Sequence, residues 1–430
     1  MRRWLMVTVC GAAAALLLSA APARAQAQGQ DAVRKEIEQL RKDFEEIRKQ
    51  YGDRLAALEA KIAAAQAAVP NQPAAPARAA VDVPPQPAPT TGDAGGGAGS
   101  KVFNPDIAVI GNFLGTSGRS PGNPDPGKAL ELHESEVALQ AIVDPYARAD
   151  FFLSFGEQGV NVEEGFVTFP TIPGGLLLKV GKMRAAFGKV NGLHTHVLPW
   201  ADRPLVTRNL VGGEDGINDA GVSVARIIPI PWFFLEATGQ VFRGDSADVF
   251  RSNQRGDLMY LARLRAYQDL SESTNIDLGA SVTTGHNGAG VVSGVDPGRF
   301  TTRLFSADAT LRWKPLQRSI YHSFIARSEF VWSRRDQGGG PQSAFGYYVS
   351  GDYQLGRRWF AGARVDHSEH ADAASLLDTG EALVLTYMPS EFSVIRGMYR
   401  RTRYAQQSRI AHEFLMQFQF AIGAHGAHPF

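Results

Sequence analysis

The feature that most constrains the fold is the way the second part of the chain is divided. From Lys101 to Phe430, segments of roughly ten residues alternate apolar and polar side chains, with Gly, Pro, Asp and Asn between them. Successive side chains of a β-strand point to opposite faces, so this alternation predicts strands rather than helices. We therefore expect residues 102–430 to be all-β.

The segments between the predicted strands are of two kinds, which alternate along the chain. Seven are short: 143–146, 170–175, 228–232, 269–274, 314–319, 354–359 and 388–392. Eight are longer and richer in Gly and charge: 115–128, 156–161, 189–218, 243–257, 285–299, 334–342, 367–375 and 404–409. They divide the region into sixteen strands, an even number, with short turns at one rim and long loops at the other. This asymmetry is typical of a transmembrane antiparallel β-barrel of the outer membrane.

The last strand shows which face would meet lipid. Its apolar stripe is Phe414, Met416, Phe418, Phe420 and Ile422, with Gln417 and Gln419 between. We expect the stripe to face lipid and the strand to pair with residues of about 105–115, which closes the barrel. A soluble β-sandwich or β-helix is the alternative, but the many charges on the other face would be costly in a dry core.

The N-terminal part differs in composition and in the pattern of its apolar residues. Residues 1–25 have a basic start, an apolar run and Ala-Arg-Ala before Gln26, which predicts a signal peptide. A transmembrane anchor is the alternative, but the apolar run is short and Pro22 follows it. The single cysteine, Cys10, lies here, so we expect an exported chain without disulfides.

Residues 26–68 are expected to form a coiled coil. Val33, Ile37, Leu40, Phe44, Ile47 and Tyr51 are spaced alternately by four and three, and the pattern resumes after a stutter near Gly52. Such a narrow stripe needs partners, so we interpret the helix as an oligomerisation stalk; a helix folded back on the barrel is the alternative. A Pro-, Ala- and Gly-rich linker follows at 69–101. Both ends of the barrel would lie at its short-turn rim, which puts the stalk in the periplasm.

The longest gap between strands, residues 189–218, is the candidate constriction, because a loop of this length inside a domain is usually functional. Lys182, Arg184, Arg263 and Arg265 could form a basic stripe opposite its acidic residues; the alternative is that wall charges pair as salt bridges. The full candidate set for the pore lining is Arg148, Lys182, Arg184, Asp202, Arg203, Arg208, Glu214, Asp215, Arg263, Arg265, Arg312, Arg327 and Arg364.

The sequence gives little evidence for a metal site, an enzyme active site or nucleic-acid binding. His194 and His196 have a spacing that can chelate a metal, as have His425 and His428, but neither pair has a clear third ligand nearby in the sequence. We expect no metal and no cofactor. The chain shows no nucleophile elbow and no HExxH motif, and we expect no enzyme activity. A formal net charge of +1 gives no case for nucleic acid.

Several runs resemble a known family. FNPDIAVIGNF at 103–113, ALQAIVDPYARADFFLSFG at 138–156, GGLLLKVGKMRAAFGKVN at 174–191 and WADRPLVTRNLVGGEDGINDAGVSV at 200–224 resemble bacterial outer-membrane porins of the phosphate-selective porin-like superfamily. Some of its members carry an N-terminal periplasmic coiled coil. The resemblance implies a trimer, a third extracellular loop folded into the pore, and Phe430 as a signal for the barrel-assembly machinery. The family's ladder of phosphate-binding residues is not recognisable here.

These observations predict a porin in the outer membrane of a Gram-negative bacterium, in contact with lipid, passing small hydrophilic solutes such as anions or dicarboxylates. The alternative is an envelope tether, in which the barrel is an anchor and the coiled coil reaches the cell wall.

Overall fold

A computed structural model describes residues 105–156, 159–246, 249–290, 300–405, 407 and 409–423, together with Glu38, Lys42 and Lys49. The chain divides into two units, Met1–Gln86 and Pro87–Phe430. In the predicted coiled coil, Glu38, Lys42 and Lys49 are helical and exposed. The predicted signal peptide, the linker and Phe430 lie outside the described residues.

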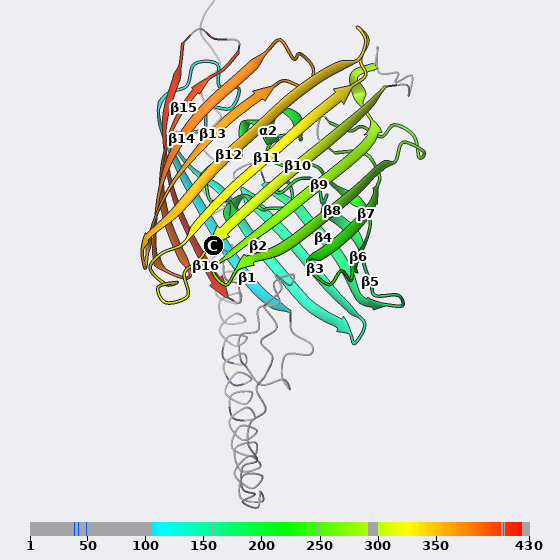
Figure 1. The fold of residues 1–430 in the computed structure, drawn as a ribbon, viewed down its shortest axis with the longest axis horizontal. Helices are drawn as coiled ribbons and strands as arrows, with labels where there is room; N and C mark the ends of the chain where they lie inside the picture. The colour runs from blue at the N-terminus through cyan, green and yellow to red at the C-terminus, as the bar shows by residue number, and fades with distance from the viewer. Residues whose placement is uncertain are drawn as a thin grey trace, which may run out of the picture. The chain divides into compact units, whose positions relative to one another are not determined.

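The described part of the second unit forms one closed antiparallel barrel of sixteen strands, in which each strand pairs with its neighbours in sequence and β1 pairs with β16 (Figure 1). This confirms the predicted strand number and the closing pair. The strands are β1 Asp106–Arg119, β2 Leu130–Asp144, β3 Ala147–Gly156, β4 Gly159–Ile172, β5 Leu176–Arg184, β6 Asn218–Ile228, β7 Phe234–Phe242, β8 Met259–Ser271, β9 Thr274–His286, β10 Thr301–Trp313, β11 Phe324–Arg335, β12 Gln342–Gly356, β13 Trp359–Glu369, β14 Leu377–Ser390, β15 Ser393–Arg403 and β16 Ala411–Gly423.

Two connections differ from the predicted alternation of length. The predicted long loop at 156–161 is tight, because Val160 and Asn161 continue the strand by pairing with Phe155 and Ser154. The predicted short turn at 314–319 is longer, since β11 begins only at Phe324. Pro315 follows Lys314 at the end of β10 and has no N–H to donate to a strand ladder.

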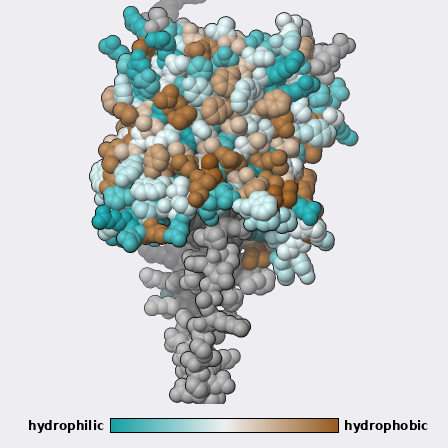
Figure 2. Space-filling view, in the orientation of Figure 1, coloured by the Kyte–Doolittle hydropathy of each residue, from teal (hydrophilic) through white to brown (hydrophobic). Residues whose placement is uncertain are grey.

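The two faces of the wall separate as the alternation predicted. On β16 the side chains of Phe414, Met416 and Phe418 are between 45% and 60% exposed, whereas Gln417 and Gln419 are 1% exposed. The space-filling view shows apolar side chains spread over the middle and lower wall, with hydrophilic ones toward both rims (Figure 2). This pattern is that of a barrel whose outer band meets an apolar medium.

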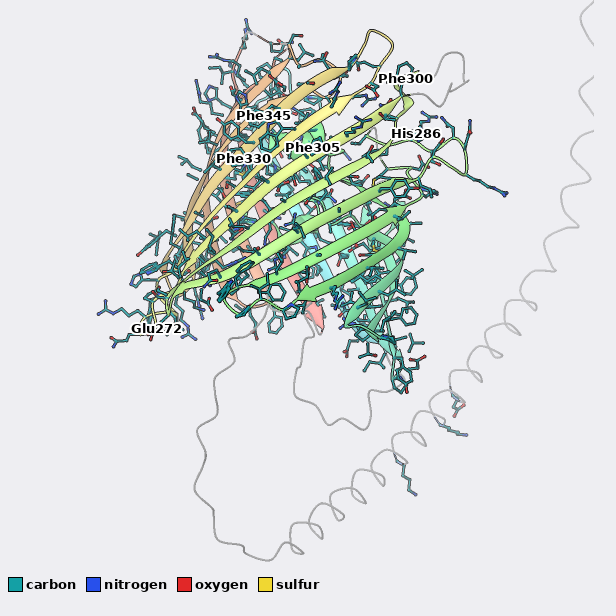
Figure 3. All side chains as sticks on the ribbon, turned by 45° about the vertical axis from the view of Figure 1, so that its right-hand side comes forward. Glu272, His286, Phe300, Phe305, Phe330 and Phe345 are labelled. Carbon is teal, nitrogen blue, oxygen red and sulfur yellow. The ribbon has the colours of Figure 1, made fainter. Side chains whose placement is uncertain are left out.

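Aromatic side chains gather on part of this outer face. Trp332 of β11 lies 5.3 Å, between ring centroids, from Phe345 of β12, and Phe330 lies 5.7 Å from Tyr347. Phe305, Phe330 and Phe345 follow one another across neighbouring strands, between Glu272 at one rim and His286 at the other (Figure 3). Aromatic residues of this kind form girdles at the boundaries of membrane barrels.

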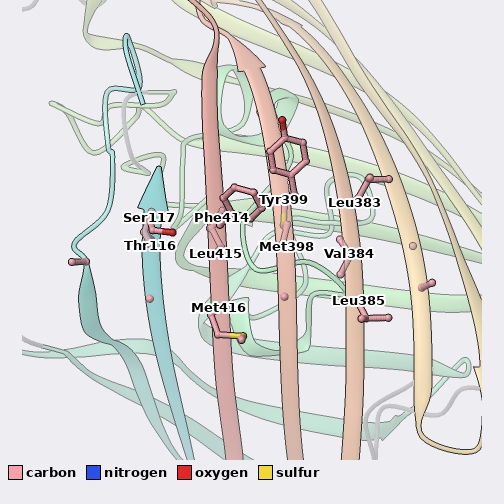
Figure 4. Close-up of a pocket in the computed structure, with 15 residues that line it drawn as sticks. Thr116, Ser117, Leu383, Val384, Leu385, Met398, Tyr399, Phe414, Leu415 and Met416 are labelled. Carbon is pink, nitrogen blue, oxygen red and sulfur yellow. The ribbon is translucent and has the colours of Figure 1, made fainter. Parts of the chain in front are cut away.

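The outer face also carries an apolar groove of about 770 Å³ over β13–β16 and β1 (Figure 4). Leu383, Leu385, Phe414 and Met416 line it, and Gly397 forms part of its floor.

The inside of the barrel is crossed by residues 185–217, which connect β5 to β6 and are called the inserted loop below. The loop contains a 3-10 turn, η1 (Thr195–Val197), and one helical turn, α2 (Leu205–Leu210), which packs against β11–β14. Its apolar side chains, among them Phe187, Leu198, Trp200 and Val206, are almost fully buried against the inner wall. In the described residues, no helix is long and apolar enough to cross a membrane.

Candidate functional site: the inserted loop and the charged lumen

The inserted loop is held at its start by side chains of the wall. The N–H groups of Lys189 and Val190 both donate to Glu329 Oε2 of β11, at 2.9 and 3.0 Å. The preceding Gly188 has a φ of +58°, and a Cβ there would collide with the Glu329 carboxylate. Glycine is therefore required for the chain to approach this acceptor.

On the side of β13 and β15, the loop is held by buried charged side chains. Asp202 accepts from Arg364 of β13 at 2.8 Å and from Arg400 of β15, and Arg364 also stacks 4.8 Å from the Trp200 ring. Burial raises the pKa of the Asp202 carboxyl, but the two guanidinium groups outweigh it, so the net pKa lies below its ordinary value. Asp202 and Arg364, both predicted from sequence, thus form an anchor rather than a free charge.

Arg203, predicted at the constriction, ties the loop to itself. Its side chain is fully buried and donates to the carbonyl oxygens of Val190 and Leu193, at 3.2 and 2.8 Å. Burial lowers the pKa of Arg203 to about 10. The side chain therefore does not face a solute path.

The other predicted basic residues of the inner wall are mostly paired. Arg263 contacts Asp308 at 2.9 Å, Arg265 contacts Asp277 at 2.8 Å, Arg148 contacts Asp150 at 2.8 Å, and Arg327 pairs with Asp352. Of the two predicted arrangements, the structure favours salt bridges over a free basic stripe. Positive charge is in excess around Asp277, which also faces Lys189 at 3.3 Å and Arg312 at 4.0 Å.

Lys182 requires a correction, because it lies on the outer face. In β5 it shares its side of the strand with Val180, which is 42% exposed, and it pairs with the exposed Ala220 of β6. Its ammonium donates to the carbonyl oxygen of Val162. The inward side chains of this strand include Lys179, which lies over the buried Phe166 ring, and Met183.

Four predicted residues border cavities near the long-loop rim. Glu214 and Asp215, both exposed, and Arg184 line a cavity of about 740 Å³, called the acidic vestibule below. Its ionisable lining is mainly negative: Asp125, Glu131, Glu134, Glu163, Glu214 and Asp215, against Lys128, His133 and Arg184. Arg208 borders a second cavity of about 480 Å³, together with Arg251 and Arg335.

Sequence reasoning missed the acidic pair Glu163-Glu164, because at period two these neighbours would face opposite sides. The pairing of β3 with β4 shifts at this point, where Glu164 faces Phe152 and Val162 faces Leu153. Glu163 is the extra residue of a β-bulge, and both carboxylates reach the lumen side. Alternation alone carries no signal for such a bulge.

The bulge brings carboxylates around His194 of the inserted loop. His194 Nδ1 lies 2.8 Å from Glu136 Oε2 and 2.9 Å from Glu163 Oε2, and Nε2 lies 2.7 Å from Glu164 Oε2. Burial lowers the pKa of His194, but the three carboxylates outweigh it, and the net pKa is well above its ordinary value. Arg184 contacts the same Glu163 oxygen at 3.1 Å.

Comparison with known proteins shows what this architecture is similar to. No family model matches the chain. An uncharacterized protein of Aquifex aeolicus (strain VF5) is 27% identical over 386 residues, covering 77% of this chain and 81% of that protein. Among solved structures, a loop L8 deletion mutant of OmpT, an outer membrane protein of Vibrio cholerae, matches 74% of this chain and 99% of its own, with a TM-score of 0.50 and 12% identity.

An anion-selective porin from Comamonas acidovorans matches 74% of this chain and 98% of its own, with a TM-score of 0.48 and 10% identity. The OmpT match shows that the fold is shared with an outer-membrane β-barrel. At sequence identities this low, neither the solute nor the oligomeric state of these proteins can be assigned to this chain.

Proposed function

We propose that this protein is an outer-membrane channel for the passive diffusion of small hydrophilic solutes. The observation that carries the proposal is a closed barrel with an apolar outer face and an ionised inner wall, crossed by a loop that wall side chains hold in place. A purely structural barrel has little use for so many interior charges, because each is costly to bury. Pore selectivity is commonly set by such charges and by a constriction.

The proposed location follows from the same surface. The apolar band with its aromatic residues would match the hydrocarbon core of a membrane, and OmpT, which shares the fold, is an outer membrane protein. The trimer, the periplasmic stalk, the barrel-assembly machinery and the cell wall stay predictions from the sequence, as does the absence of enzyme activity.

For the solute, we propose a modest preference for cations in place of the predicted preference for anions. The basic residues predicted for the pore lining mostly have carboxylate partners, so they present little net positive charge. The exposed charges at the acidic vestibule are mainly negative: Asp125, Glu214 and Asp215, against Lys128. A permeating ion responds to net charge along its path.

Recordings from the purified full chain in planar bilayers, under a KCl gradient, test both statements. Channel steps with a reversal potential on the cation-selective side are expected. The double variant Glu214→Gln/Asp215→Asn should move the reversal potential toward zero. Glu381→Gln is the matched control, since Glu381 is an exposed carboxylate paired with Arg401 on β14 and β15. Absence of channel steps would refute the channel, whereas anion selectivity would refute the cation preference alone.

The tether alternative depends on residues outside the described ranges. A chain lacking residues 26–101 separates it from the channel proposal. If the tether is the function, this deletion causes envelope defects while conductance stays the same; if the channel is the function, channels persist and the oligomer is weaker.

A further inference from the structure

The inserted loop meets β2 at a cluster of potential metal ligands. His194 and His196 flank Thr195 in η1, and both present Nδ1 toward Glu136 of β2. Glu136 Oε2 lies 2.8 Å from His194 Nδ1 and 3.5 Å from His196 Nδ1. One ligand atom from each residue lies within 4.8 Å of the others. The sequence had left this histidine pair without a third ligand, and the fold supplies one.

The Glu136 carboxylate is poorly satisfied by the protein alone. Its side chain is 2% exposed, and Oε2 makes no hydrogen bond of acceptable geometry in the described part of the chain. A buried carboxylate oxygen without a donor is costly, because it has lost its hydration and gained no hydrogen bond in return. This oxygen points at two imidazole nitrogens, so a group placed between them would be held by all three residues.

The second nitrogen of His194 supports the same reading. Its contact with Glu164, at 2.7 Å, has the geometry of a hydrogen bond. A neutral imidazole that donates Nε2–H to a carboxylate keeps a lone pair on Nδ1, so a metal ion that binds there takes the place of the Nδ1 proton. This arrangement, a carboxylate behind a histidine, is the usual support for a histidine that ligates a metal.

We propose that Glu136, His194 and His196 form a binding site for a divalent transition-metal ion of the Zn²⁺ class. Two imidazoles and one carboxylate are a donor set that such ions accept and that Mg²⁺ and Ca²⁺ do not favour. Glu163 and Glu164 add negative charge around the site, against the guanidinium of Arg184. A divalent cation would offset this excess.

The two distances to the Glu136 carboxylate are close to what binding requires, and one ligand nitrogen of each imidazole lies within 4.8 Å of the other. Ligand atoms about 2.0–2.1 Å from a tetrahedral ion lie about 3.3 Å apart. The His196–Glu136 contact, at 3.5 Å, already fits, and the His194–Glu136 contact must lengthen by a fraction of an ångström. Glu163 Oε2, 2.9 Å from His194 Nδ1, or a water would complete the shell.

The acidic vestibule provides an access path. Thr195, which lies between the two histidines, lines it together with Glu134 and Glu163. A bound ion would join the inserted loop to β2, as Asp202 joins it to β13 and β15. The binding site itself does not depend on whether the barrel conducts solutes.

Equilibrium dialysis of Zn²⁺ against the purified full chain, made without an oligohistidine tag and stripped with a chelator, tests the site. One Zn²⁺ per chain is expected, not displaced by excess Mg²⁺. Glu136→Gln and His196→Gln should abolish this stoichiometric binding. Glu164→Gln, a change to a positioning residue, should weaken it by roughly 10–100-fold. The double variant His425→Gln/His428→Gln controls for adventitious binding by the C-terminal histidines and should bind as the wild type does.

A second measurement keeps the test independent of how the variants fold. The X-ray absorption spectrum of Zn²⁺ on the wild-type chain should show nitrogen and oxygen ligands at about 2.0–2.2 Å, with scattering from two imidazoles. No stoichiometric binding, a spectrum without imidazole, or equal affinity in Glu136→Gln, His196→Gln and the wild type would each overturn the proposal. The cluster would then be satisfied by a protonated His194 alone.

Discussion

At the scale of single residues, the interior charges act mainly as ties between the wall and the inserted loop. Asp202 is the clearest case, because one carboxylate receives hydrogen bonds from Arg364 and Arg400, which come from different strands. Each arginine has a second carboxylate partner, Asp366 for Arg364 and Glu413 for Arg400. The buried network is electrically close to balanced, which is the condition under which buried ions are tolerated.

Removal of this carboxylate should therefore destabilise the barrel. Asp202→Asn weakens the charge-assisted hydrogen bonds that hold the inserted loop to Arg364 and Arg400, and we expect the free energy of unfolding to fall by about 1–3 kcal/mol. Urea unfolding in detergent, followed by circular dichroism, measures the change. Asp215→Asn is the control, since Asp215 is exposed and accepts from Arg184 through its backbone oxygen. Equal stability of the two variants would contradict the anchor.

At the scale of elements, small departures from regular strands decide what reaches the lumen. The bulge in β4 turns both Glu163 and Glu164 inward. In β5, Gly181 has a φ of +142°, and its backbone approaches Gly165 and Phe166 so closely that a Cβ would collide with them. Glycine is the residue that adopts this conformation without strain. The inserted loop begins directly after β5.

Gly181→Ala should therefore disturb the pairing of β4 with β5. The new methyl group would meet the Gly165 carbonyl oxygen, and the backbone conformation alone costs an alanine roughly 1–3 kcal/mol. We expect a lower thermal midpoint and a smaller folded fraction after refolding. Gly239→Ala in β7 should leave both unchanged, because open space surrounds a Cβ at that position. If both variants refold equally well, the close approach at Gly181 is not important.

At the scale of the whole molecule, the barrel is built with its apolar face outward and a charged, loop-crossed interior. Its outer wall exposes large apolar side chains such as Leu383, Leu385 and Phe418, while the inner wall buries Arg364, Arg396 and Glu413. This inversion of the usual soluble pattern is stable only if something apolar surrounds the wall.

A charge introduced at mid-wall therefore tests the lipid environment. Leu385 lies in the middle of β14 and is 47% exposed, so Leu385→Arg should cost about 2–4 kcal/mol in a bilayer. Leu377→Arg, on the same face but at the first residue of the strand, should cost about 0–1 kcal/mol. The folded fraction in lipid vesicles across a urea series measures both. If Leu385→Arg costs no more than Leu377→Arg, this face does not contact lipid.

The sequence by itself determined the strand number, the direction of closure, the two faces of most strands and the loop that crosses the interior. Each depends on local pattern: strand side chains alternate strictly, and Gly and Pro mark where strands end. The same locality explains the failure at Glu163, because a bulge shifts the period without a strong sign in the sequence. Lys182 was wrongly predicted to face the lumen although its strand alternates regularly, with the exposed Val180 on the same side.

Only the tertiary structure decided which charges are partners. Asp202 meets Arg364 and Arg400, and His194 meets Glu136 and Glu164, across the lumen from distant parts of the chain. A pattern of alternation says which way a side chain points but not what stands opposite. For that reason the sequence did not show that most of the predicted pore-lining arginines have carboxylate partners, or that the histidine pair gains a third potential ligand from β2.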